Sequence, residues 1–537
     1  MTKSRVSFLV ILAAVGLALV YSWFPNGRGK LDAAQEKYPS PRFPSYLKPP
    51  KSITDLMPSA RAAVRQTAGR TPLGLAKAGQ KVLLLVPPRQ DAMVVQAIIA
   101  AMKERGVEAQ AVYEYELRGV SRAEALKEPL QTGADGWTEI CFRAPDVCRF
   151  LPENLKSQTV RVALLAREKF KDYLDKHTGI DVIFAGLGGR TQWKTAMGDH
   201  GKKLYGNWIY LNHYDLLSKV AAFPSDVWRL VEERTLEPLA WSEEGRVTDP
   251  EGTNIGWKMS ETLARDWSKG AYQQGHLYLY PFQATGRFPY SVLKYPDTEK
   301  EYIPAQVPEA ANGVIAGTTG HFGYFPQIKV YIKDSYIDRV EGGGKYGDVI
   351  RALLNVPALK NTQYPYLPKP GYWYLWEAGT GTNPKFFRPV PDLLGSLDMP
   401  NLPERNADGV VHWGFGAEVQ HDPTNKWEQF GKENKVPWEH SFHIHNLLPT
   451  FRVKIRGAGQ WLNIIDKGRL SALDSFEARA LASRYGDPKE LLNEDWVPDI
   501  PGINVGGDYQ RDFAKDPWNY VHKQLIAIEK GTYKHFK

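Results

Sequence analysis

The stretch Lys81–Leu117, KVLLLVPPRQDAMVVQAIIAAMKERGVEAQAVYEYEL, decides the fold class. Lys81–Pro87 is an apolar run of strand length. Asp91–Gly106 has apolar residues at helical spacing, with an Asp at its start and a Gly at its end. Val107–Leu117 then has the pattern of a second strand. A strand, a helix and a strand of these lengths predict a βαβ unit, and with it an α/β fold.

The α/β pattern continues through residues 61–240, which we predict to form one domain. VRVALLA (160–166) and DVIFAGLGG (181–189) are predicted as further buried strands. The Gly-Leu-Gly-Gly turn lacks the third glycine of a nucleotide-binding loop, and no acidic residue ends a following strand. It is interpreted as a tight turn at a strand end.

Residues 241–537 have shorter predicted strands, many aromatic residues and many Gly or Pro turns. They predict an α+β domain that would carry the chemistry. SALDSFEARALASRYG (471–486) is predicted as an amphipathic helix, and the last fifty residues are predicted to wrap around the body.

The N-terminus predicts a membrane anchor over residues 1–24, followed by a tether over 25–60. Val6–Phe24 has 19 residues without a charge. At a helical rise of ~1.5 Å per residue, a helix of this length is about as long as the hydrocarbon core of a bilayer is thick. A cleaved secretory signal is the alternative reading. Pro39–Pro50 has five prolines and predicts a stiff, extended tether. The soluble body is expected on the outer, periplasmic or extracytoplasmic side of a bacterial membrane.

Composition excludes several classes of protein. The chain has 537 residues, a net charge of +8 and no block of basic residues, so no nucleic-acid partner is expected. Two cysteines exclude a disulfide scaffold and a Cys-rich metal site. Cys141 and Cys148 would either close a small disulfide loop or remain as thiols.

Histidines cluster in the second domain. Five of the chain's 12 histidines lie within residues 412–445, and neutral imidazole is the commonest metal ligand in proteins. His443 and His445 are two residues apart, so on a strand they project from the same face. His412 lies in another strand-like run, and Glu377 is a lone carboxylate in an aromatic stretch, where a cation would offset its burial.

Each of these residues also has a structural interpretation. A single histidine in a strand is usually a packed, hydrogen-bonded core residue. His421 and His440 adjoin polar, loop-like sequence and are interpreted as solvated. A cupin site also uses His-x-His but needs a Glu a few residues further on, and Asn446–Pro449 follows here instead.

Residues 247–450 resemble the thermophilic-type metalloaminopeptidases (aminopeptidase T, family M29) and the related 2,5-dihydroxypyridine 5,6-dioxygenases. The resemblance rests on VTDPEGTNI, ANGVIAG, VYIKDSYIDRVEGGG, WEAGTGTNP, GVVHWGFG and SFHIHN. It implies metal-ligand roles for Glu377, His412 and His443, with His445 in the place of an aspartate. Relatives are often dimers, so the resemblance also leaves a homodimer as an expectation.

The departures from the family favour one metal over two. Arg287 stands where the peptidases have another metal-binding glutamate, and the family's tyrosine near Val419 is missing. The first hypothesis is a mononuclear non-heme iron enzyme, with Fe(II) held by His412, His443 and His445, with or without Glu377, that cleaves an aromatic ring of a small molecule.

Two other functions remain open. A metal-dependent hydrolase resembling the aminopeptidases would use Zn, Mn or Co on a peptide substrate, with Glu377 or Glu418 as the catalytic base. The other is a non-catalytic, membrane-tethered binding protein that kept the fold and lost the metal ligands. Arg287 favours this function, because it stands in the place of a ligand.

Overall fold

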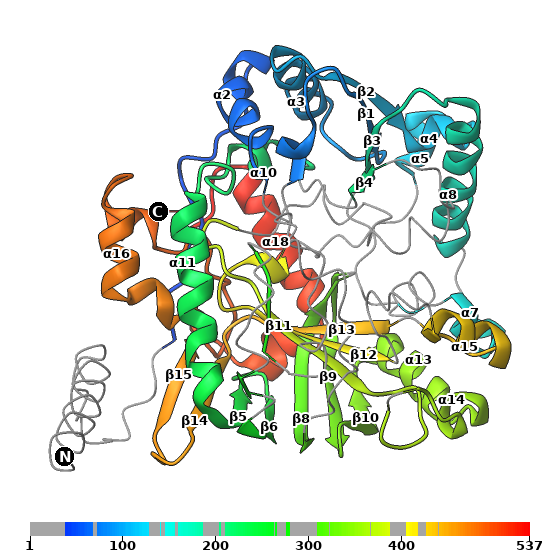
Figure 1. The fold of residues 1–537 in the computed structure, drawn as a ribbon, viewed down its shortest axis with the longest axis vertical. Helices are drawn as coiled ribbons and strands as arrows, with labels where there is room; N and C mark the ends of the chain where they lie inside the picture. Colours follow the sequence, from blue (N-terminus) through cyan, green and yellow to red (C-terminus); the bar gives the residue numbers. More distant parts are fainter. Residues whose placement is uncertain are drawn as a thin grey trace, which may run out of the picture.

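The computed structural model contains two β-sheets with helices around them (Figure 1). It describes residues 38–67, 72–127, 140, 145–155, 159–185, 203–205, 210–261, 264–265, 275–279, 309–321, 323–365, 367–386, 404–416, 426–438 and 440–536. The mixed α/β class expected from the sequence is confirmed.

The smaller sheet is parallel and has the order β2-β1-β3-β4. Its strands are β1 (Lys81–Val86), β2 (Glu108–Tyr113), β3 (Val182–Ala185) and β4 (Lys203–Tyr205). The predicted βαβ unit is present, since α3 (Ala92–Glu104) connects β1 to β2. Val82 and Leu84 pack in one apolar cluster and Leu83 and Leu85 in another, so the run of apolar residues in β1 reflects burial on both faces.

One predicted strand is wrong. Residues 160–166 form the first part of α8 (Thr159–Lys176), an 18-residue helix. Phe170 and Leu174, four residues apart, are both buried against the small sheet's second cluster. A short apolar run fits a buried strand or a helix equally well, and here the helical spacing further along decides it.

The first half of the chain also contains helices and 3₁₀ turns. They are α2 (Ile53–Ala63), η1 (Pro72–Leu75), α4 (Glu114–Leu117), α5 (Arg122–Ala125), α7 (Pro145–Cys148), η2 (Glu153–Leu155), α10 (His213–Leu217), α11 (Ser225–Leu236) and η3 (Glu237–Trp241). The strand predicted over 107–117 ends at Tyr113, where the chain turns into α4. The predicted domain boundaries remain predictions.

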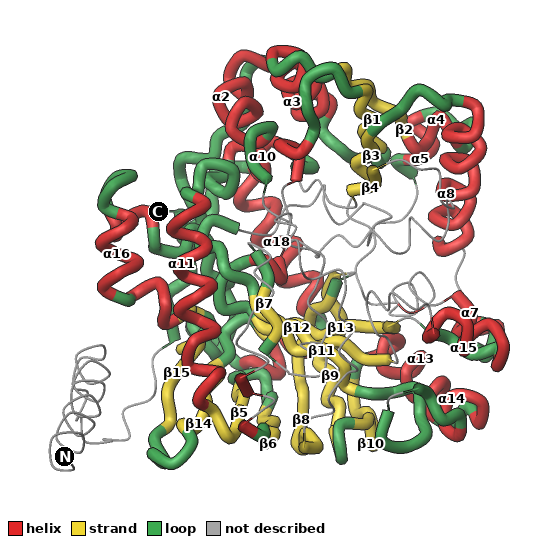
Figure 2. Tube along the Cα trace, in the orientation of Figure 1, coloured by secondary structure: helices red, strands yellow, loops and turns green. Residues whose placement is uncertain are grey.

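Among the described residues, the larger sheet, in the lower part of Figure 2, has 12 strands, and its paired strands run antiparallel. Its main order is β16-β15-β14-β5-β6-β8-β13-β12-β11-β7, and β9 and β10 extend from β8. The strands are β5 (Ser242–Thr248), β6 (Asn254–Lys258), β7 (Leu277–Tyr278), β8 (Glu309–Gly320), β9 (Gly323–Lys333), β10 (Tyr336–Gly342), β11 (Leu375–Thr380), β12 (Val411–Gly416), β13 (His440–Asn446), β14 (Thr450–Ile455), β15 (Trp461–Asp466) and β16 (Arg469–Leu470).

Helices flank the larger sheet. They are α13 (Gly344–Leu354), α14 (Pro357–Asn361), η6 (Glu404–Asn406), α15 (Lys426–Asn434), η7 (Ser471–Asp474), α16 (Phe476–Ala482), α17 (Pro488–Leu491), the π-helical η8 (Gln510–Ala514) and α18 (Pro517–Glu529). The helix predicted over 471–486 is shorter, because residues 471–474 form a 3₁₀ turn. The Ser475 side chain caps α16 by accepting from the Ala478 N–H.

The two ends of the described chain are joined. The Phe43 N–H donates to the His535 carbonyl at 3.1 Å. The Phe43 ring makes edge contacts with Tyr214, Tyr533 and Phe536. The C-terminal segment therefore holds the segment that was predicted as a tether.

The predicted anchor and one cysteine lie outside the described residues. Among the residues that the structure describes, no helix is long and apolar enough to cross a membrane. Cys148 is disulfide-bonded, and Cys141, the chain's other cysteine, is not among the described residues.

Two carboxylates are buried together near the end of β5. Burial, together with the neighbouring Glu251, raises the pKa of Asp249 well above its usual range. Burial also raises the pKa of Glu251 from 4.5 to about 7. Hydrogen bonds from the hydroxyls of Thr318 (2.7 Å) and Tyr509 (2.8 Å) lower this pKa, but burial outweighs them.

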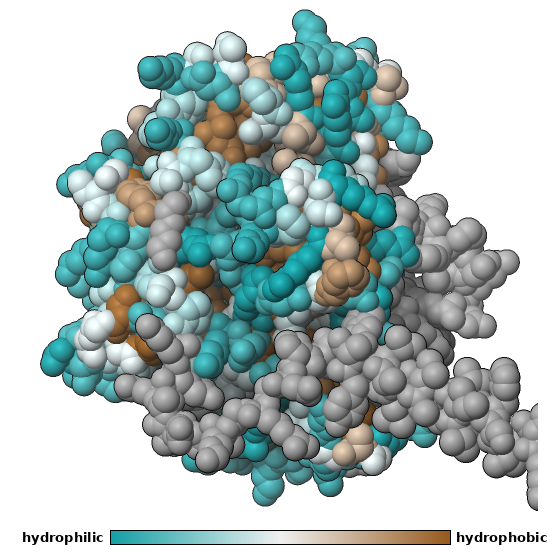
Figure 3. Space-filling view, turned by 90° about the vertical axis from the view of Figure 1, so that its left-hand side faces the viewer, coloured by the Kyte–Doolittle hydropathy of each residue, from teal (hydrophilic) through white to brown (hydrophobic). Residues whose placement is uncertain are grey.

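Replacing Phe43 with Ala should lower the free energy of unfolding by about 3–5 kcal/mol, because a fully packed ring is lost and the two chain ends separate. Urea unfolding checks this. The control is Phe476→Ala, a residue that is 82% exposed. It begins α16, which lies at the left of Figure 1, the side that faces the viewer in Figure 3. Its effect should stay within about 0.5 kcal/mol. Equal effects of the two changes would contradict the account.

Glu251→Gln should remove a pH dependence of stability. The native carboxyl keeps its proton to about pH 7 and the unfolded one only to about 4.5, so unfolding becomes easier as pH rises between these values. The variant should match the parent near pH 4.5 and exceed it by on the order of 2 kcal/mol at pH 8. A difference independent of pH in urea unfolding would refute this.

Candidate metal centre

Three neighbouring strands bring the predicted residues together. Glu377 is on β11, His412 on β12 and His443 and His445 on β13. β12 pairs antiparallel with both β11 and β13, with His412 opposite Gly379 on one side and His445 on the other. Residues opposite each other in an antiparallel pair project from the same face. The sheet register thus gathers residues that are up to 68 positions apart in the chain.

Glu377 is the centre of a histidine cluster. Its Oε1 atom lies 2.8 Å from His412 Nε2 and 3.2 Å from His276 Nε2, and its Oε2 atom lies 3.2 Å from His443 Nε2. All four side chains are almost fully buried. Ligand atoms of His276, Glu377 and His412 lie within 4.8 Å of one another, close enough to bind one metal ion.

His276 comes from a separate segment at the edge of the sheet. It precedes β7, whose Leu277 and Tyr278 pair with Thr380 and Gly379 of β11. Figure 2 shows β7 next to β11 and β12. The His276 and His412 ring centroids are 4.3 Å apart. A Cβ atom on Gly379 would lie 2.4 Å from His276 Cε1 and 2.5 Å from His412 Cε1, so glycine leaves the room for both rings.

The electrostatics favour an ionised Glu377 beside a neutral His412 ring. Burial would raise the pKa of Glu377, but His412 and the contacts with His276 and His443 outweigh it and hold the pKa well below its usual range. Burial lowers the pKa of His412 well below 6.5, and Arg405 contributes to this shift, so the ring is neutral at pH 7. A carboxylate and neutral imidazoles are the protonation states that bind metals.

A second carboxylate and histidine lie beside this cluster. Glu404 Oε1 lies 2.8 Å from His445 Nδ1, and both side chains are fully buried. The His321 ring stacks on His443 at 3.8 Å between centroids and lies 5.0 Å from the His445 ring. The Arg405 guanidinium donates to His321 Nε2 at 3.3 Å. This side of the cluster therefore holds a fixed positive charge.

The structure brings together three of the four predicted ligands. Glu377, His412 and His443 meet, whereas His445 is paired with Glu404 and makes no described contact with Glu377. His440 begins β13, while Glu418, His421 and Arg287 are not among the described residues. The metal-binding roles of Glu377, His412, His443 and His445 remain predictions, as do the catalytic roles of Glu377 and Glu418.

Sequence reasoning missed His276, His321 and Glu404. His276 and His321 are isolated in the chain, outside the dense window at 412–445, and Glu404 adjoins no histidine in sequence. One weak signal existed: each histidine follows a glycine at the edge of an apolar or aromatic strand pattern, in GHLYL and GHFG.

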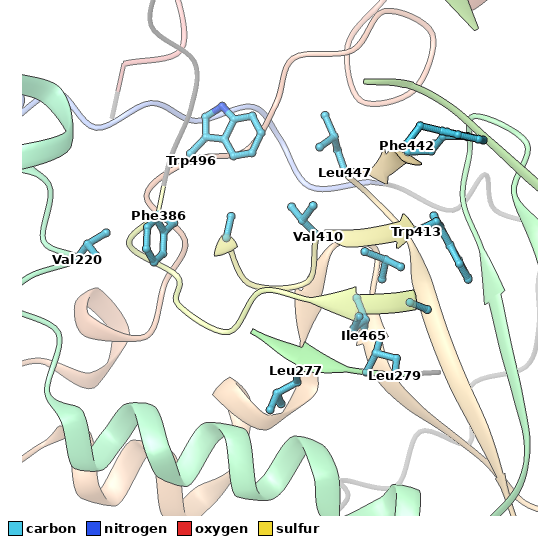
Figure 4. Close-up of a cluster of buried hydrophobic side chains, with 14 of the residues drawn as sticks. Val220, Leu277, Leu279, Phe386, Val410, Trp413, Phe442, Leu447, Ile465 and Trp496 are labelled. Carbon is cyan, nitrogen blue, oxygen red and sulfur yellow. The ribbon is translucent and has the colours of Figure 1, made fainter. Parts of the chain in front are cut away.

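Buried apolar residues adjoin the cluster residues along the strands. Leu277 and Leu279 follow His276, and Trp413 follows His412; all three are buried (Figure 4). Phe442 and Ile444 alternate with the histidines of β13 and are also buried. Alternation along the strands thus places polar groups on one face and core residues on the other.

Comparison with known proteins adds a distant likeness. No protein-family profile and no curated protein matches the chain. Two solved structures are similar: 2,5-dihydroxypyridine dioxygenase from Pseudomonas putida KT2440 and wild-type AmpT from Thermus thermophilus. The dioxygenase has 12% sequence identity and a TM-score of 0.38, over 79% of this chain and 99% of its own. AmpT has 14% sequence identity and a TM-score of 0.38, over 78% of this chain and 100% of its own. The relationship is distant.

Gly379→Ala should disturb the cluster, because its methyl group would force the His276 and His412 rings apart. We expect a loss of about 1–3 kcal/mol in urea unfolding, as for other overpacked sites. Gly179→Ala is the matched control, since a Cβ atom there meets nothing within 4 Å. The account is wrong if the Gly379 variant is as stable as the Gly179 variant.

Proposed function

We propose that this chain is a metal-dependent enzyme that binds one divalent ion at Glu377, His276, His412 and His443. One observation carries the proposal: three buried imidazoles each have a nitrogen 2.8–3.2 Å from the carboxylate oxygens of the buried Glu377. Three imidazoles around a single carboxylate are an unusual use of a protein core, where apolar residues pack at lower cost.

The residues fit a metal ion. The donors are imidazole nitrogens and one carboxylate, a set that suits iron, zinc, copper or nickel. His412 has a second buried nitrogen, Nδ1, with no hydrogen-bond partner among the described residues. Gly379 keeps open the space between two of the rings.

The neighbouring charges favour one ion over two. A second ion would have to use Glu404, His445 and His321, on the side of the cluster where Arg405 lies. The guanidinium would repel a dication there. His445 is therefore proposed as a neighbour of the metal ligands, held by Glu404.

The proposed reaction is oxidative cleavage of an aromatic ring, with Fe(II) as the metal. A bound iron ion would supply the sites at which a ring substrate and O₂ meet. The protein's own residues would fix the ligand geometry through three paired strands, and the burial of all four donor side chains would exclude water. One carboxylate together with imidazoles is a donor set that suits non-heme Fe(II).

A metal-dependent hydrolase is the second candidate. The same imidazole and carboxylate donors also suit one catalytic zinc with a bound water. A binding protein that uses the cluster without an ion is the third.

Metal analysis of the full chain, purified without chelators and without air, tests the proposal. We expect about one ion per chain, lost in Glu377→Gln and in His412→Ala but kept in His522→Ala, a histidine change on α18 away from the cluster. No metal in the parent protein would refute the proposal.

The same samples separate the two reactions. Uptake of O₂ with hydroxylated aromatic or heteroaromatic compounds would support the oxygenase. Hydrolysis of aminoacyl amides under nitrogen, with Zn, Mn or Co bound, would support the hydrolase instead.

We also infer that the body faces an oxidising compartment, anchored through residues 1–24. The support is the disulfide at Cys148 and the uncharged run Val6–Phe24. Thiol alkylation of denatured protein from cells should label the chain only after reduction. Full labelling without a reductant would contradict the inference.

A further inference from the structure

A buried carboxylate outside the cluster connects two of its segments. Glu232 is on α11 and its side chain is fully buried. Its Oε1 atom accepts two hydrogen bonds, one from the Gly275 N–H and one from the Thr382 hydroxyl, both at 2.8 Å. The Trp228 indole N–H, one turn earlier on α11, donates to the Thr382 hydroxyl oxygen at 2.8 Å.

Both partners of Glu232 adjoin proposed metal ligands. Gly275 directly precedes His276, and Thr382 lies two residues beyond the end of β11, which carries Glu377. The Gly275 N–H also lies 3.1 Å from the Thr382 hydroxyl oxygen. One carboxylate oxygen thus holds the start of the His276 segment against the end of the Glu377 strand.

Strand pairing and Glu232 hold the two sides of the His276 segment. β7 is a two-residue strand that pairs with Gly379 and Thr380 of β11, and it is last in the strand order of the described sheet. Pairing fixes the residues after His276, and Glu232 fixes the residue before it. Gly275 has φ +128°, a backbone conformation that other residues rarely adopt, so glycine is favoured at the position before His276.

The position of Glu232 makes this contact one of the protein interior. Its side chain has no exposure, so its oxygen atoms must be satisfied by groups inside the protein. Gly275 and Thr382 are two of these groups, and each lies within two residues of the chain segments that carry His276 and Glu377.

We propose that Glu232 is a positioning residue for the metal centre: it sets the place of His276 relative to Glu377. This proposal rests on the proposed metal site, and it means that α11, a helix of the first half of the chain, helps to position the metal ligands. Partners of this kind behind metal ligands typically change metal affinity 10–100-fold when removed.

Two substitutions separate positioning from general stability. Glu232→Met keeps the size but removes the acceptor, and we expect the dissociation constant for Co(II) to rise about 10–100-fold with a shifted visible spectrum. Glu232→Gln keeps one carbonyl oxygen that can accept both hydrogen bonds. It should stay within about threefold of the parent protein.

The control is a buried carboxylate that has no described hydrogen bond or ion pair with the four proposed ligands. Asp499 accepts from the Tyr520 hydroxyl at 2.8 Å near the C-terminus, and Asp499→Leu should lower stability without changing Co(II) binding. If Glu232→Met fails to fold, Thr382→Val decides, because it removes the hydroxyl between Trp228 and Glu232 and should also weaken binding.

The outcomes distinguish the two proposals. Parent protein that binds no metal overturns both the metal site and the role of Glu232. Parent protein that binds Co(II), with Glu232→Met binding equally well, overturns the role of Glu232 alone. Equal weakening by Asp499→Leu would also overturn it, because the effect would then be one of stability.

Discussion

The second half of the structure depends on a buried negative charge. Glu377 is 2% exposed, in the middle of a strand whose other residues are apolar or small. Its charge is stable there because three imidazoles surround it. The register of β11, β12 and β13 brings two of them, His412 and His443, and the pairing of β7 with β11 brings His276. A shift of one residue in that register would point each histidine to the opposite face.

Distant segments complete the site. His276 approaches from the edge of the sheet, and Gly379 makes room for it beside His412. α11, which lies before the large sheet in the chain, contributes Glu232 and Trp228 behind this edge. The first half of the chain is therefore part of the support of the site and more than a separate α/β unit.

The sequence predicted the parts whose signal is local. The βαβ unit at 81–117 follows from apolar periodicity, and Glu377, His412 and His443 stood out through composition and an isolated carboxylate. His276 and His321 could not be found this way, because long-range strand pairing and not local sequence brings them to the cluster. The strand predicted at 160–166 was wrong for a related reason, since a seven-residue apolar run fits two structures.

X-ray absorption spectroscopy at the edge of the bound metal tests the central claim most directly, because it reports the ligands themselves. The account predicts about three imidazole ligands and at least one oxygen ligand around one ion, with one imidazole fewer in His276→Ala. A spectrum without imidazole ligands, or one unchanged in that variant, would contradict it.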